Sequence, residues 1–497
     1  MGVSADETTR SILVGGKWRG ADSHREVTNP ATSGVISRMA DSDESVVREA
    51  IDSASWALER WRATSGFERY GFLWRVGDLL SERAEAIGET LAEETGKLLA
   101  EAVGEVRFSA DYFYWFAGEA RRMEQLSVVD GRATGPQMVV KKPVGVVASL
   151  TPWNFPVSIQ ARKVAPALAA GCTVVARPSE EAPNSVVELF RCLVDAGLPE
   201  GVANLVTGSA STVTGPILED PRVGLVSFTG STGVGKMLYE KSASTMKKLA
   251  LELGGCAPFV MLEDADLDHT LEQAMIAKLR NCGQSCVAAN VYYVHDDLYE
   301  KFVQGLANRV RSLKLGDPFD GGTTVGPLIN ARRRAAIEEL REKAVAAGFE
   351  PVAAAPPLEG GSGLSPDCFF APELLAAPSH ENVEAKLLGT EVFGPLFLVA
   401  GFSDLDRLVP ELNRNPLGLA SYVFSGDVAK AAQVATRLDV GISGINEGVA
   451  SAANVPMGGV KDSGLGREGG RVGMEEFLET QYLAVRGKPF GSWAFGE

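Results

Sequence analysis

Residues 223–236 read VGLVSFTGSTGVGK, an apolar run of strand length that leads through a glycine-rich turn into a helical pattern. Glycines allow a tight turn there, and the free N–H groups and dipole of a helix N-terminus favour a bound phosphate. Gly230, Gly235 and Lys236 fit the phosphate-binding loop of NTPases. However, Met237 replaces the hydroxyl that holds magnesium in that loop. The stretch therefore indicates a dinucleotide-binding strand–turn–helix unit more than an NTPase.

The same strand–helix unit repeats on both sides of this stretch. Such alternation predicts a parallel, doubly wound sheet, because right-handed crossovers place each helix on a face of the sheet. The expected strands are 144–150, 173–176, 202–206 and 223–228, and the expected helices are 157–170, 183–196 and 211–219. A second α/β block begins at 258–261 and continues to about residue 445. The fold class is therefore α/β.

The remaining segments have simpler patterns. Residues 11–40 read as short strands and turns, and helical periodicity dominates from about 43 to 120, with Ser45 as a candidate N-cap. The aromatic cluster at 112–116 reads as hydrophobic core. Residues 351–366, rich in proline, glycine and serine, read as a surface loop.

Length and composition limit the function. A chain of 497 residues is too long for one core and predicts two or three domains. The formal net charge of −16 argues against nucleic acid or an anionic membrane surface as the main partner. No apolar run approaches the ~18 residues of a membrane span, and the N-terminus lacks a secretory signal pattern. Six cysteines without metal-ligand spacing make a metal site unexpected and fit a reducing compartment, so we expect a cytoplasmic protein.

A candidate nucleophile lies just past the middle of the chain. Residues 278–287 read KLRNCGQSCV and follow a helical run over 267–279. A β-branched and aromatic run at 291–294 comes next, so Cys286 is expected on a turn between two regular elements. A thiolate is a strong nucleophile near neutral pH when its surroundings lower its pKa, although an isolated cysteine is more often an inert core residue.

Two further residues have the chemistry to assist a nucleophile. Glu252 ends a predicted strand before Gly254 and Gly255, where a carboxylate can act as a general base on water or simply cap a turn. Asn154 lies in residues 151–156 (TPWNFP), a loop whose two prolines fix its shape. The amide of this asparagine can donate to an oxyanion.

Together, these motifs resemble the aldehyde dehydrogenase superfamily. The chain contains, in the order of that family, PWNFP at 152–156, FTGS at 228–231, ELGG at 252–255, GQSC at 283–286 and EVFGP at 391–395. The resemblance extends from about Leu13 to Tyr482. It implies NAD(P)-dependent oxidation of an aldehyde to a carboxylic acid through a cysteine thiohemiacetal and a thioester.

The resemblance also assigns roles to individual residues. Cys286 matches the nucleophile, Asn154 the oxyanion donor and Glu252 the base that activates the hydrolytic water. Glu468 matches a proposed proton relay. The cofactor-binding positions implied are Thr151, Pro152, Trp153, Arg177, Ser179, Glu180, Phe228, Thr229, Gly230, Ser231, Leu253, Glu391 and Phe393.

The nucleotide preference is expected to depend on residues 177–180. Glu180 can accept hydrogen bonds from a free ribose hydroxyl and repels a 2′-phosphate. Arg177, where the family usually has lysine, and Ser179 can instead hold such a phosphate. If Glu180 faces the 2′ position, its repulsion decides. We then expect a preference for NAD of about tenfold, or ~1.4 kcal/mol, with NADP still usable.

The substrate is expected to be an aldehyde with a carboxylate at its far end. Arg162 lies eight residues after Asn154, and Arg280 lies six residues before Cys286, so both arginines are expected to line the channel to the nucleophile. A guanidinium binds a carboxylate bidentately, although each arginine has the alternative of pairing with a nearby Asp or Glu. Arg162, Arg280 and Ser451 match the carboxylate-binding positions of succinate-semialdehyde dehydrogenases.

Succinate semialdehyde is therefore the expected substrate. Glutarate semialdehyde, one methylene longer, is an alternative because such a difference is worth only ~1–3 kcal/mol. A non-carboxylated aldehyde is a further alternative. A non-enzymatic member of the superfamily is disfavoured, because Cys286, Glu252 and Asn154 are all present.

The resemblance implies a Rossmann-type cofactor domain, an α/β catalytic domain and a small β oligomerisation arm. An exposed two-stranded arm, with 138–140 paired to 483–485, is an aggregation hazard unless it pairs with another chain. A homodimer or homotetramer is therefore expected. The expected limits are 8–123, 144–254 and 447–474 for the cofactor domain, 255–446 for the catalytic domain, and 124–143 and 475–497 for the arm.

A redox switch at the nucleophile is a last hypothesis. Some succinate-semialdehyde dehydrogenases carry a second cysteine two residues after the nucleophile, where this chain has Ala288. Cys282, four residues before Cys286, is the nearby candidate for a disulfide, because Cα atoms on a turn can come within the ~4.4–6.8 Å that a disulfide needs.

Overall fold

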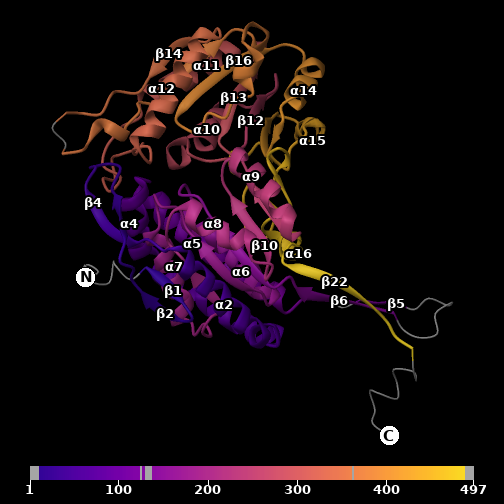
Figure 1. Ribbon diagram of the computed structural model, residues 1–497. Helices are drawn as coiled ribbons and strands as arrows, with labels where there is room; N and C mark the ends of the chain where they lie inside the picture. Colours follow the sequence, from indigo (N-terminus) through magenta and orange to yellow (C-terminus); the bar gives the residue numbers. More distant parts are fainter. Residues whose placement is uncertain (1–10, 124–125, 129–136, 361–362, 487–497) are drawn as a thin grey trace.

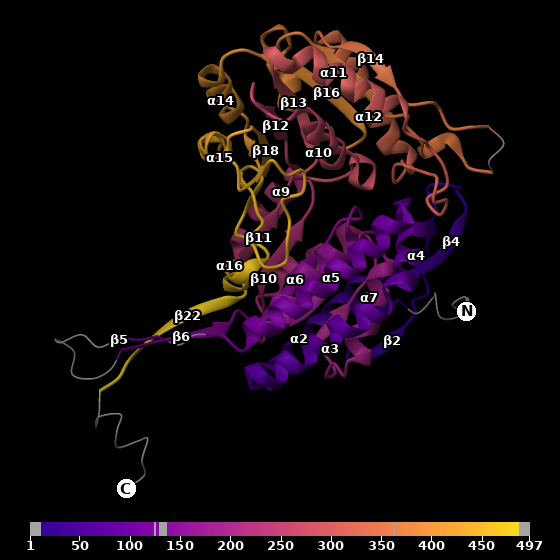
Figure 2. The ribbon, with the colours of Figure 1, turned by 180° about the vertical axis from the view of Figure 1, so that it is seen from behind.

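The computed structural model describes residues 11–123, 126–128, 137–360 and 363–486, and the statements below concern these residues. Two bodies, each built around a β-sheet, lie one above the other in Figure 1, and a thin β arm projects from the lower body. Figure 2 shows from behind that the C-terminal strand of the arm reaches away from both bodies.

The lower body contains the doubly wound sheet predicted from the strand–helix alternation. Its strand order is β2-β1-β9-β8-β7-β10-β11-β21, with parallel pairing from β9 to β11. The central strands are buried apolar runs, which is typical of a sheet covered by helices on both faces. The strands are β1 (Ile12–Val14), β2 (Lys17–Arg19), β7 (Val146–Leu150), β8 (Thr173–Arg177), β9 (Ala203–Leu205), β10 (Val223–Thr229), β11 (Lys248–Glu252) and β21 (Gly464–Leu465).

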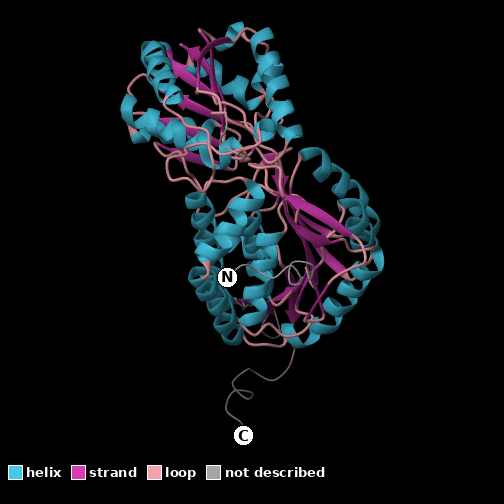
Figure 3. Ribbon diagram, turned by 90° about the vertical axis from the view of Figure 1, so that its left-hand side faces the viewer, coloured by secondary structure: helices cyan, strands magenta, loops and turns pink. Residues whose placement is uncertain are grey.

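Helices cover both faces of this sheet, as Figure 3 shows. One hydrophobic core includes residues of α2, α8 and α9, and a larger core on the opposite face includes residues of α3 to α7. The helices are α2 (Glu44–Arg62), α3 (Gly66–Glu82), α4 (Ala84–Thr95), α5 (Leu99–Ala120), α6 (Pro156–Ala170), α7 (Asn184–Asp195), α8 (Ala210–Glu219), α9 (Thr232–Ser242), η1 (Ala243–Thr245) and α16 (Gly470–Glu475). A separate hairpin consists of β3 (His24–Thr28) and β4 (Val35–Ala40).

The first long helix does not begin with the predicted cap. The N-cap of α2 is Asp43, whose Oδ1 accepts a hydrogen bond from Val46 N at 3.0 Å. Ser45 lies inside the first turn, and its Oγ donates to the same carboxylate at 2.6 Å. The prediction of Ser45 was wrong by two residues, because both side chains are good caps and periodicity alone does not choose between them.

The upper body is the predicted second α/β block. Its sheet has the order β14-β15-β16-β13-β12-β18-β19 and is parallel except at β14. The strands are β12 (Ala257–Met261), β13 (Ala289–His295), β14 (Glu350–Ala354), β15 (Glu373–Ala377), β16 (Leu396–Phe402), β18 (Ala420–Phe424) and β19 (Ile442–Ile445), and a small pair joins β17 (Leu417–Gly418) to β20 (Val460–Lys461). The helices are α10 (Leu267–Leu279), η2 (Arg280–Gly283), α11 (Asp296–Arg311), α12 (Ala331–Ala346), η3 (Pro366–Cys368), η4 (His380–Asn382), α13 (Ala385–Leu388), α14 (Leu405–Asn413) and α15 (Val428–Arg437).

The predicted surface loop at 351–366 is partly a strand. Residues 351–354 belong to β14 and pair antiparallel with β15. Composition misled the prediction here, because Pro351 does not exclude a strand at the edge of a sheet. Residues 361–362 of this segment lie outside the described residues.

The arm joins the two predicted segments, but it has three strands instead of two, and residues 138–140 lie opposite 481–483 instead of 483–485. Its strands β5 (Leu126–Val128), β6 (Gln137–Pro143) and β22 (Leu478–Ala484) form a sheet in the order β22-β6-β5, with Met138 opposite Leu483. The expected segments 124–125, 129–136 and 487–497 of the arm, and 8–10 of the cofactor domain, lie outside the described residues. Within the described ranges, no helix is long and apolar enough to cross a membrane.

Candidate active site

Cys286 lies in a tight loop between α10 and β13. The backbone φ angles of Asn281, Cys282 and Gly283 are all positive, at 52°, 55° and 75°. Such angles are unfavourable for residues other than glycine, so the loop needs outside support. A Cβ atom at Gly255 would lie 2.2 Å from the carbonyl oxygen of Cys286, so glycine is required for the close approach of the ELGG turn to this loop.

Buried amides supply the support for this loop. The side chain of Asn281 donates through Nδ2 to Asn154 O at 2.8 Å and to Gln284 O at 3.3 Å. Gln284 is fully buried, and its Oε1 accepts from Ile329 N at 2.9 Å while its Nε2 donates to Asn281 O at 3.1 Å. The loop is therefore fixed to both bodies of the molecule.

The thiol of Cys286 is protonated in its resting environment. The residue is partly exposed to a cavity, but its thiol is largely buried away from water, which raises the pKa of the thiol to about 12. The positive charge of Arg162 opposes this rise, and the carboxyl groups of Glu391 and Glu252 reinforce it. Nucleophilic attack by this sulfur therefore requires a proton acceptor.

The structure brings Asn154 to the same loop. Asn154 precedes α6, is 4% exposed, and donates through Nδ2 to Gln284 O at 3.1 Å. A carboxamide nitrogen carries two N–H groups, so this bond leaves one donor for the oxygen of a substrate. The predicted oxyanion role of Asn154 needs such a free donor, and the role itself stays a prediction.

Glu252 and Glu468 form a buried acidic pair with opposite titration behaviour. Burial and the neighbouring charge of Glu468 raise the pKa of Glu252 well above its ordinary value. Burial also acts against ionisation of Glu468, but the charges and hydrogen bonds of Lys163 and Arg162 outweigh it and lower that pKa. Within the described residues Glu252 Oε2 has no hydrogen-bond partner, so this carboxyl group has an oxygen available for water.

Arg162 lies beside this pair on α6. Its Nε is 2.7 Å from Glu468 Oε2, and its side chain is buried. The hydroxyl of Tyr112, whose pKa is raised by burial, interacts with both Arg162 and Ser451. Tyr112 thus joins two of the three predicted substrate-binding residues, although its aromatic cluster read only as core.

The third predicted substrate residue approaches from the other side. The Arg280 guanidinium lies 5.7 Å from the ring centre of Phe155, the residue after Asn154. Both Arg280 and Cys286 act electrostatically on the hydroxyl of Tyr422, which donates to Val287 O at 2.6 Å. Arg162 therefore acts on Cys286 itself, and Arg280 acts on a tyrosine bonded to the residue after it, while their role in substrate binding stays a prediction.

A cavity of about 450 Å³ leads to Cys286. Trp153 and Phe393 stand edge-to-face across it, with ring centres 5.8 Å apart, and Glu391 accepts a hydrogen bond from Gly255 N at 3.2 Å. The start of α9 contributes Ser231 as its N-cap. Ten of the predicted residues line the cavity: Pro152, Trp153, Asn154, Thr229, Gly230, Ser231, Leu253, Cys286, Glu391 and Phe393.

Thr151 and Phe228 are not among the residues that line this cavity. Thr151 is buried and donates through Oγ1 to Gln160 Oε1 at 2.8 Å, so it supports the loop from behind. Phe228 is one of the last residues of β10, and a Cβ at Gly230 would lie 2.3 Å from its ring. The structure thus gives both residues a supporting position.

Residues 178–180 line a second, narrow pocket at the ends of β8 and β9, and Arg177 precedes them as the last residue of β8. Arg177 donates to Gly208 O at 3.0 Å and to Glu180 Oε1 at 2.7 Å. Arg25, from the β3–β4 hairpin, lies 2.9 Å from the other oxygen of Glu180. Ser179 and Glu180 line the pocket together with Arg25 and Asp41. No sequence motif indicated Arg25 at this pocket.

Helix α12 and the two residues before it add side chains to the larger cavity that no sequence motif indicated. Ile329, Asn330, Arg332, Arg333 and Ala336 line it from the upper body. The Arg333 guanidinium lies 5.5 Å from the ring centre of Phe393 and donates to Val392 O at 2.6 Å. In the described ranges no group of three or more His, Cys, Asp or Glu side chains is arranged to hold a metal ion.

Cys282 does not face the nucleophile. It belongs to the hydrophobic core of the upper body with residues such as Val260 and Ile337, and burial raises its pKa. All six cysteines are free thiols. The structure therefore contains no disulfide between Cys282 and Cys286, and the hypothesis that oxidation forms one stays a prediction.

The fold and the site define an α/β oxidoreductase with a cysteine at its candidate site. The chain belongs to the aldehyde dehydrogenase family, whose model matches residues 18–483. It is 40% identical over 478 residues to the glutarate-semialdehyde dehydrogenase of Pseudomonas putida, with 96% of this chain and 98% of that protein covered.

Two further proteins illustrate the similarity. The NADP(+)-dependent succinate-semialdehyde dehydrogenase of Escherichia coli is 39% identical, with 96% of this chain and 98% of that protein covered. The crystal structure of a succinate-semialdehyde dehydrogenase from Burkholderia pseudomallei superimposes with a TM-score of 0.91 at 38% identity, covering 96% of this chain and 99% of that chain. The predicted family and fold are thereby confirmed.

Proposed function

We propose that the protein oxidises succinate semialdehyde to succinate with NAD(P). Charge at the site carries this proposal. Arg162, Lys163 and Glu468 form one buried cluster, in which two cations face a single carboxylate whose pKa is lowered. The raised pKa of Glu252 favours its neutral form. Burial lowers the pKa of Lys163 against the opposing charge of Glu468, so the positive charge close to Cys286 is that of Arg162, which suits an aldehyde with an anionic far end.

The residues of this chain support a covalent route. Cys286 Sγ attacks the carbonyl carbon, its proton passes to a base, and the carbonyl oxygen becomes the hydroxyl of a thiohemiacetal. Asn154 Nδ2 donates to that oxygen while it carries negative charge. Loss of hydride from carbon and of the hydroxyl proton leaves a thioester on Cys286. Glu252 then takes a proton from water, which attacks the thioester and releases the carboxylic acid and the thiol.

The larger cavity fits a nicotinamide dinucleotide. Its buried Thr229 Oγ1 has no partner among the described residues, and the N-terminus of α9 favours an anionic group such as a pyrophosphate. Ser231, Glu391 and Phe393 would hold the cofactor, which supplies the hydride acceptor when bound. Trp153 and Arg333 fix the ring of Phe393 from two sides.

For the nucleotide preference we propose NAD, with NADP usable. Glu180 and Asp41 oppose Arg25 and Arg177, so the narrow pocket has little net charge to attract a 2′-phosphate. A carboxylate there can accept hydrogen bonds from a free ribose hydroxyl. The two flanking guanidinium groups limit the preference to about tenfold.

We further propose that the arm joins copies of the chain into a homodimer or homotetramer, since β5 and β22 are the open edges of its sheet. The six free thiols agree with a reducing compartment, and we place the protein in the cytoplasm. Light scattering after gel filtration measures the assembly, and a monomeric mass would contradict the first of these proposals.

Glutarate semialdehyde is the second candidate substrate, favoured by the 40% identity to the Pseudomonas putida enzyme. The deciding experiment measures kcat/KM by NADH absorbance for succinate semialdehyde, glutarate semialdehyde and butanal. We expect the two acids to exceed butanal by at least about tenfold and succinate semialdehyde to lead. An equal kcat/KM for butanal would contradict an anionic substrate. Loss of all NADH production in Cys286→Ala is the control for the chemistry.

A further inference from the structure

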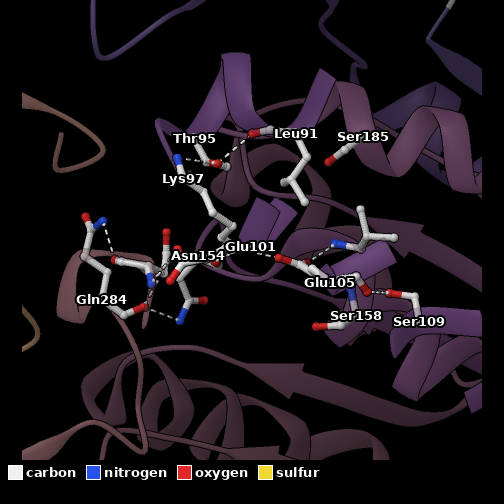
Figure 4. Close-up of polar contacts among 12 residues, drawn as sticks. Leu91, Thr95, Lys97, Glu101, Glu105, Ser109, Asn154, Ser158, Ser185 and Gln284 are labelled. Carbon is white, nitrogen blue, oxygen red and sulfur yellow. Dashed lines mark hydrogen bonds and ion pairs between the residues drawn. The ribbon is translucent and has the colours of Figure 1, made fainter. Parts of the chain in front are cut away.

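Lys97 is a buried cation that the sequence motifs do not include. It lies in the turn between α4 and α5, and its ammonium group is fully buried. Burying an ammonium group is costly unless its donors are satisfied. Lys97 Nζ forms an ion pair with Glu105 and donates to the backbone oxygen of Asn154 at 3.0 Å. It also lies 4.0 Å from the ring centre of Phe155. Figure 4 shows the side chain reaching from its turn toward Asn154 and Glu105.

Glu105 fixes the other end of the same loop. Its side chain is 3% exposed, and while Oε2 pairs with Lys97, Oε1 accepts from Val157 N and Ser158 N, both at 3.1 Å. These are among the first N–H groups of α6, which begins directly after Asn154 and Phe155. A carboxylate at a helix N-terminus satisfies free N–H groups and interacts favourably with the helix dipole. Glu105 thus holds both α6 and the Lys97 ammonium group.

The Asn154 carbonyl is the point where these contacts converge. It accepts from Lys97 Nζ at 3.0 Å and from Asn281 Nδ2 at 2.8 Å. One turn before Glu105, Glu101 accepts from Asn281 N at 3.1 Å and so ties the cysteine loop to the same helix. With its backbone held on one side, the Asn154 side chain extends to Gln284 O on the other.

We propose that Lys97 and Glu105 are positioning residues that hold the Asn154 amide at the Cys286 loop, ready for the developing oxyanion. This inference rests on the oxyanion role of Asn154 in the proposed function. The ammonium group restrains the backbone of Asn154, and the carboxylate restrains the ammonium group. A shift of about 1 Å in a positioned donor is enough to lower a rate by roughly a hundredfold. Lys97 touches neither the thiol nor a reacting atom.

A double-mutant cycle tests this inference. Lys97→Met keeps the length of the side chain, fills the site and removes the donor. We expect Lys97→Met to lower kcat and the rate of the NADH burst by about 10- to 100-fold. This loss is smaller than the loss expected when the Asn154 amide itself is removed. The KM for NAD and the rate of Cys286 alkylation by iodoacetamide stay within about twofold of wild type. In an Asn154→Ala background, adding Lys97→Met lowers kcat by no more than about twofold, because the amide to be positioned is gone.

Two further variants make the cycle specific. Lys247 is also a buried lysine, 8% exposed, and donates to Val223 O at 3.0 Å far along β10 from the site. Lys247→Met measures the general cost of deleting such an ammonium group, and we expect its kcat to stay within about twofold of wild type at 25 °C. Lys97→Gln retains a neutral donor and is carried through the same cycle, with a smaller expected loss than Lys97→Met. If Lys97→Met does not fold, the Lys97→Gln cycle decides alone.

The outcomes separate this inference from the proposed function. Equal losses from Lys97→Met in the wild-type and Asn154→Ala backgrounds overturn the positioning role, as does an unchanged kcat in Lys97→Met. In either case a large loss in Asn154→Ala alone leaves the oxyanion role intact. If Asn154→Ala itself retains wild-type kcat, the oxyanion role in the proposed function fails first.

Discussion

The guanidinium of Arg162 is ion-paired with the carboxylate of Glu468, with 2.7 Å between Nε and Oε2. The sequence assigned these residues to separate tasks, Arg162 to the substrate carboxylate and Glu468 to proton relay. In the structure they share one buried cluster with Lys163 and Glu252. In the proposed function, binding of an anionic substrate and proton transfer at the base are therefore electrostatically coupled.

The first prediction concerns pH. Glu252 must be ionised to act as a base, so its raised pKa makes kcat fall as pH falls. Because the charge of Glu468 contributes to that rise, Glu468→Gln lowers the pKa of Glu252 and moves the acidic limb of kcat to lower pH. Profiles at saturating aldehyde and NAD measure this shift. If the acidic limb of Glu468→Gln stays at the wild-type pH, or if this limb persists in Glu252→Gln, the limb does not report the ionisation of Glu252.

The second prediction separates acylation from hydrolysis. Thioester formation precedes the attack of water, so Glu252→Gln is expected to keep a stoichiometric burst of NADH and to lose steady-state turnover by about 10²- to 10⁴-fold. Stopped-flow absorbance with enzyme at micromolar concentration resolves both phases. Cys286→Ala serves as the control without a burst. A burst that disappears in Glu252→Gln would instead give this carboxylate a role in activating the thiol.

The third prediction concerns substrate recognition. Arg280→Ala is expected to cost ~1.5–3 kcal/mol in kcat/KM for succinate semialdehyde and much less for butanal, because only the first substrate offers a carboxylate. Arg162→Ala has a similar expected loss but also leaves Glu468 with Lys163 as its only cation in the ion-pair cluster. Arg280→Ala is therefore the cleaner variant.

Arg437→Ala is the matched control for the arginine variants. Arg437 forms a surface ion pair with Asp406, and we expect its removal to leave kcat/KM for both substrates within about twofold of wild type. Equal losses for succinate semialdehyde and butanal in Arg280→Ala would show that this arginine supports the cysteine loop instead of the substrate.

The fourth prediction concerns the cofactor. Removing the guanidinium of Arg25 leaves Glu180 with less positive charge around it, so Arg25→Ala is expected to increase the preference for NAD over NADP. Glu180→Ser is expected to reduce or reverse the preference for NAD over NADP. The ratio of kcat/KM values for NAD and NADP measures the change, and about tenfold corresponds to ~1.4 kcal/mol. A wild-type ratio that favours NADP would show that the two arginines control this pocket.

The fifth prediction concerns redox sensitivity. Cys282 packs in the core, so we expect peroxide to inactivate wild type and Cys282→Ser at the same rate. Dithiothreitol is expected to restore activity to the same extent in both proteins. Slower reactivation or loss of reversibility in Cys282→Ser would revive the disulfide hypothesis. Mass spectrometry of the oxidised protein locates any bond that forms.

Several parts of the fold and site follow from the sequence alone. The strand–turn–helix unit of β10 and α9, the turn that carries Cys286 and the position of Glu252 at the end of β11 rest on hydrophobic period and on glycine placement. These are local signals, because the same few residues that carry the pattern also form the element. Ser45 and residues 351–354 show the limit of local signals. In both places the local pattern is compatible with more than one structure.

The tertiary structure decided what no local pattern contains. Lys97 and Asn154 are 57 residues apart, and Lys163 and Glu468 are 305 residues apart, yet each pair is in contact. Likewise, Arg25 reaches Glu180 only because the β3–β4 hairpin packs beside the ends of β8 and β9. A buried charge needs a partner, but burial and the identity of that partner are set by packing of distant segments. The sequence therefore determined which groups react, and the tertiary structure determined which groups hold them in place and set their charge.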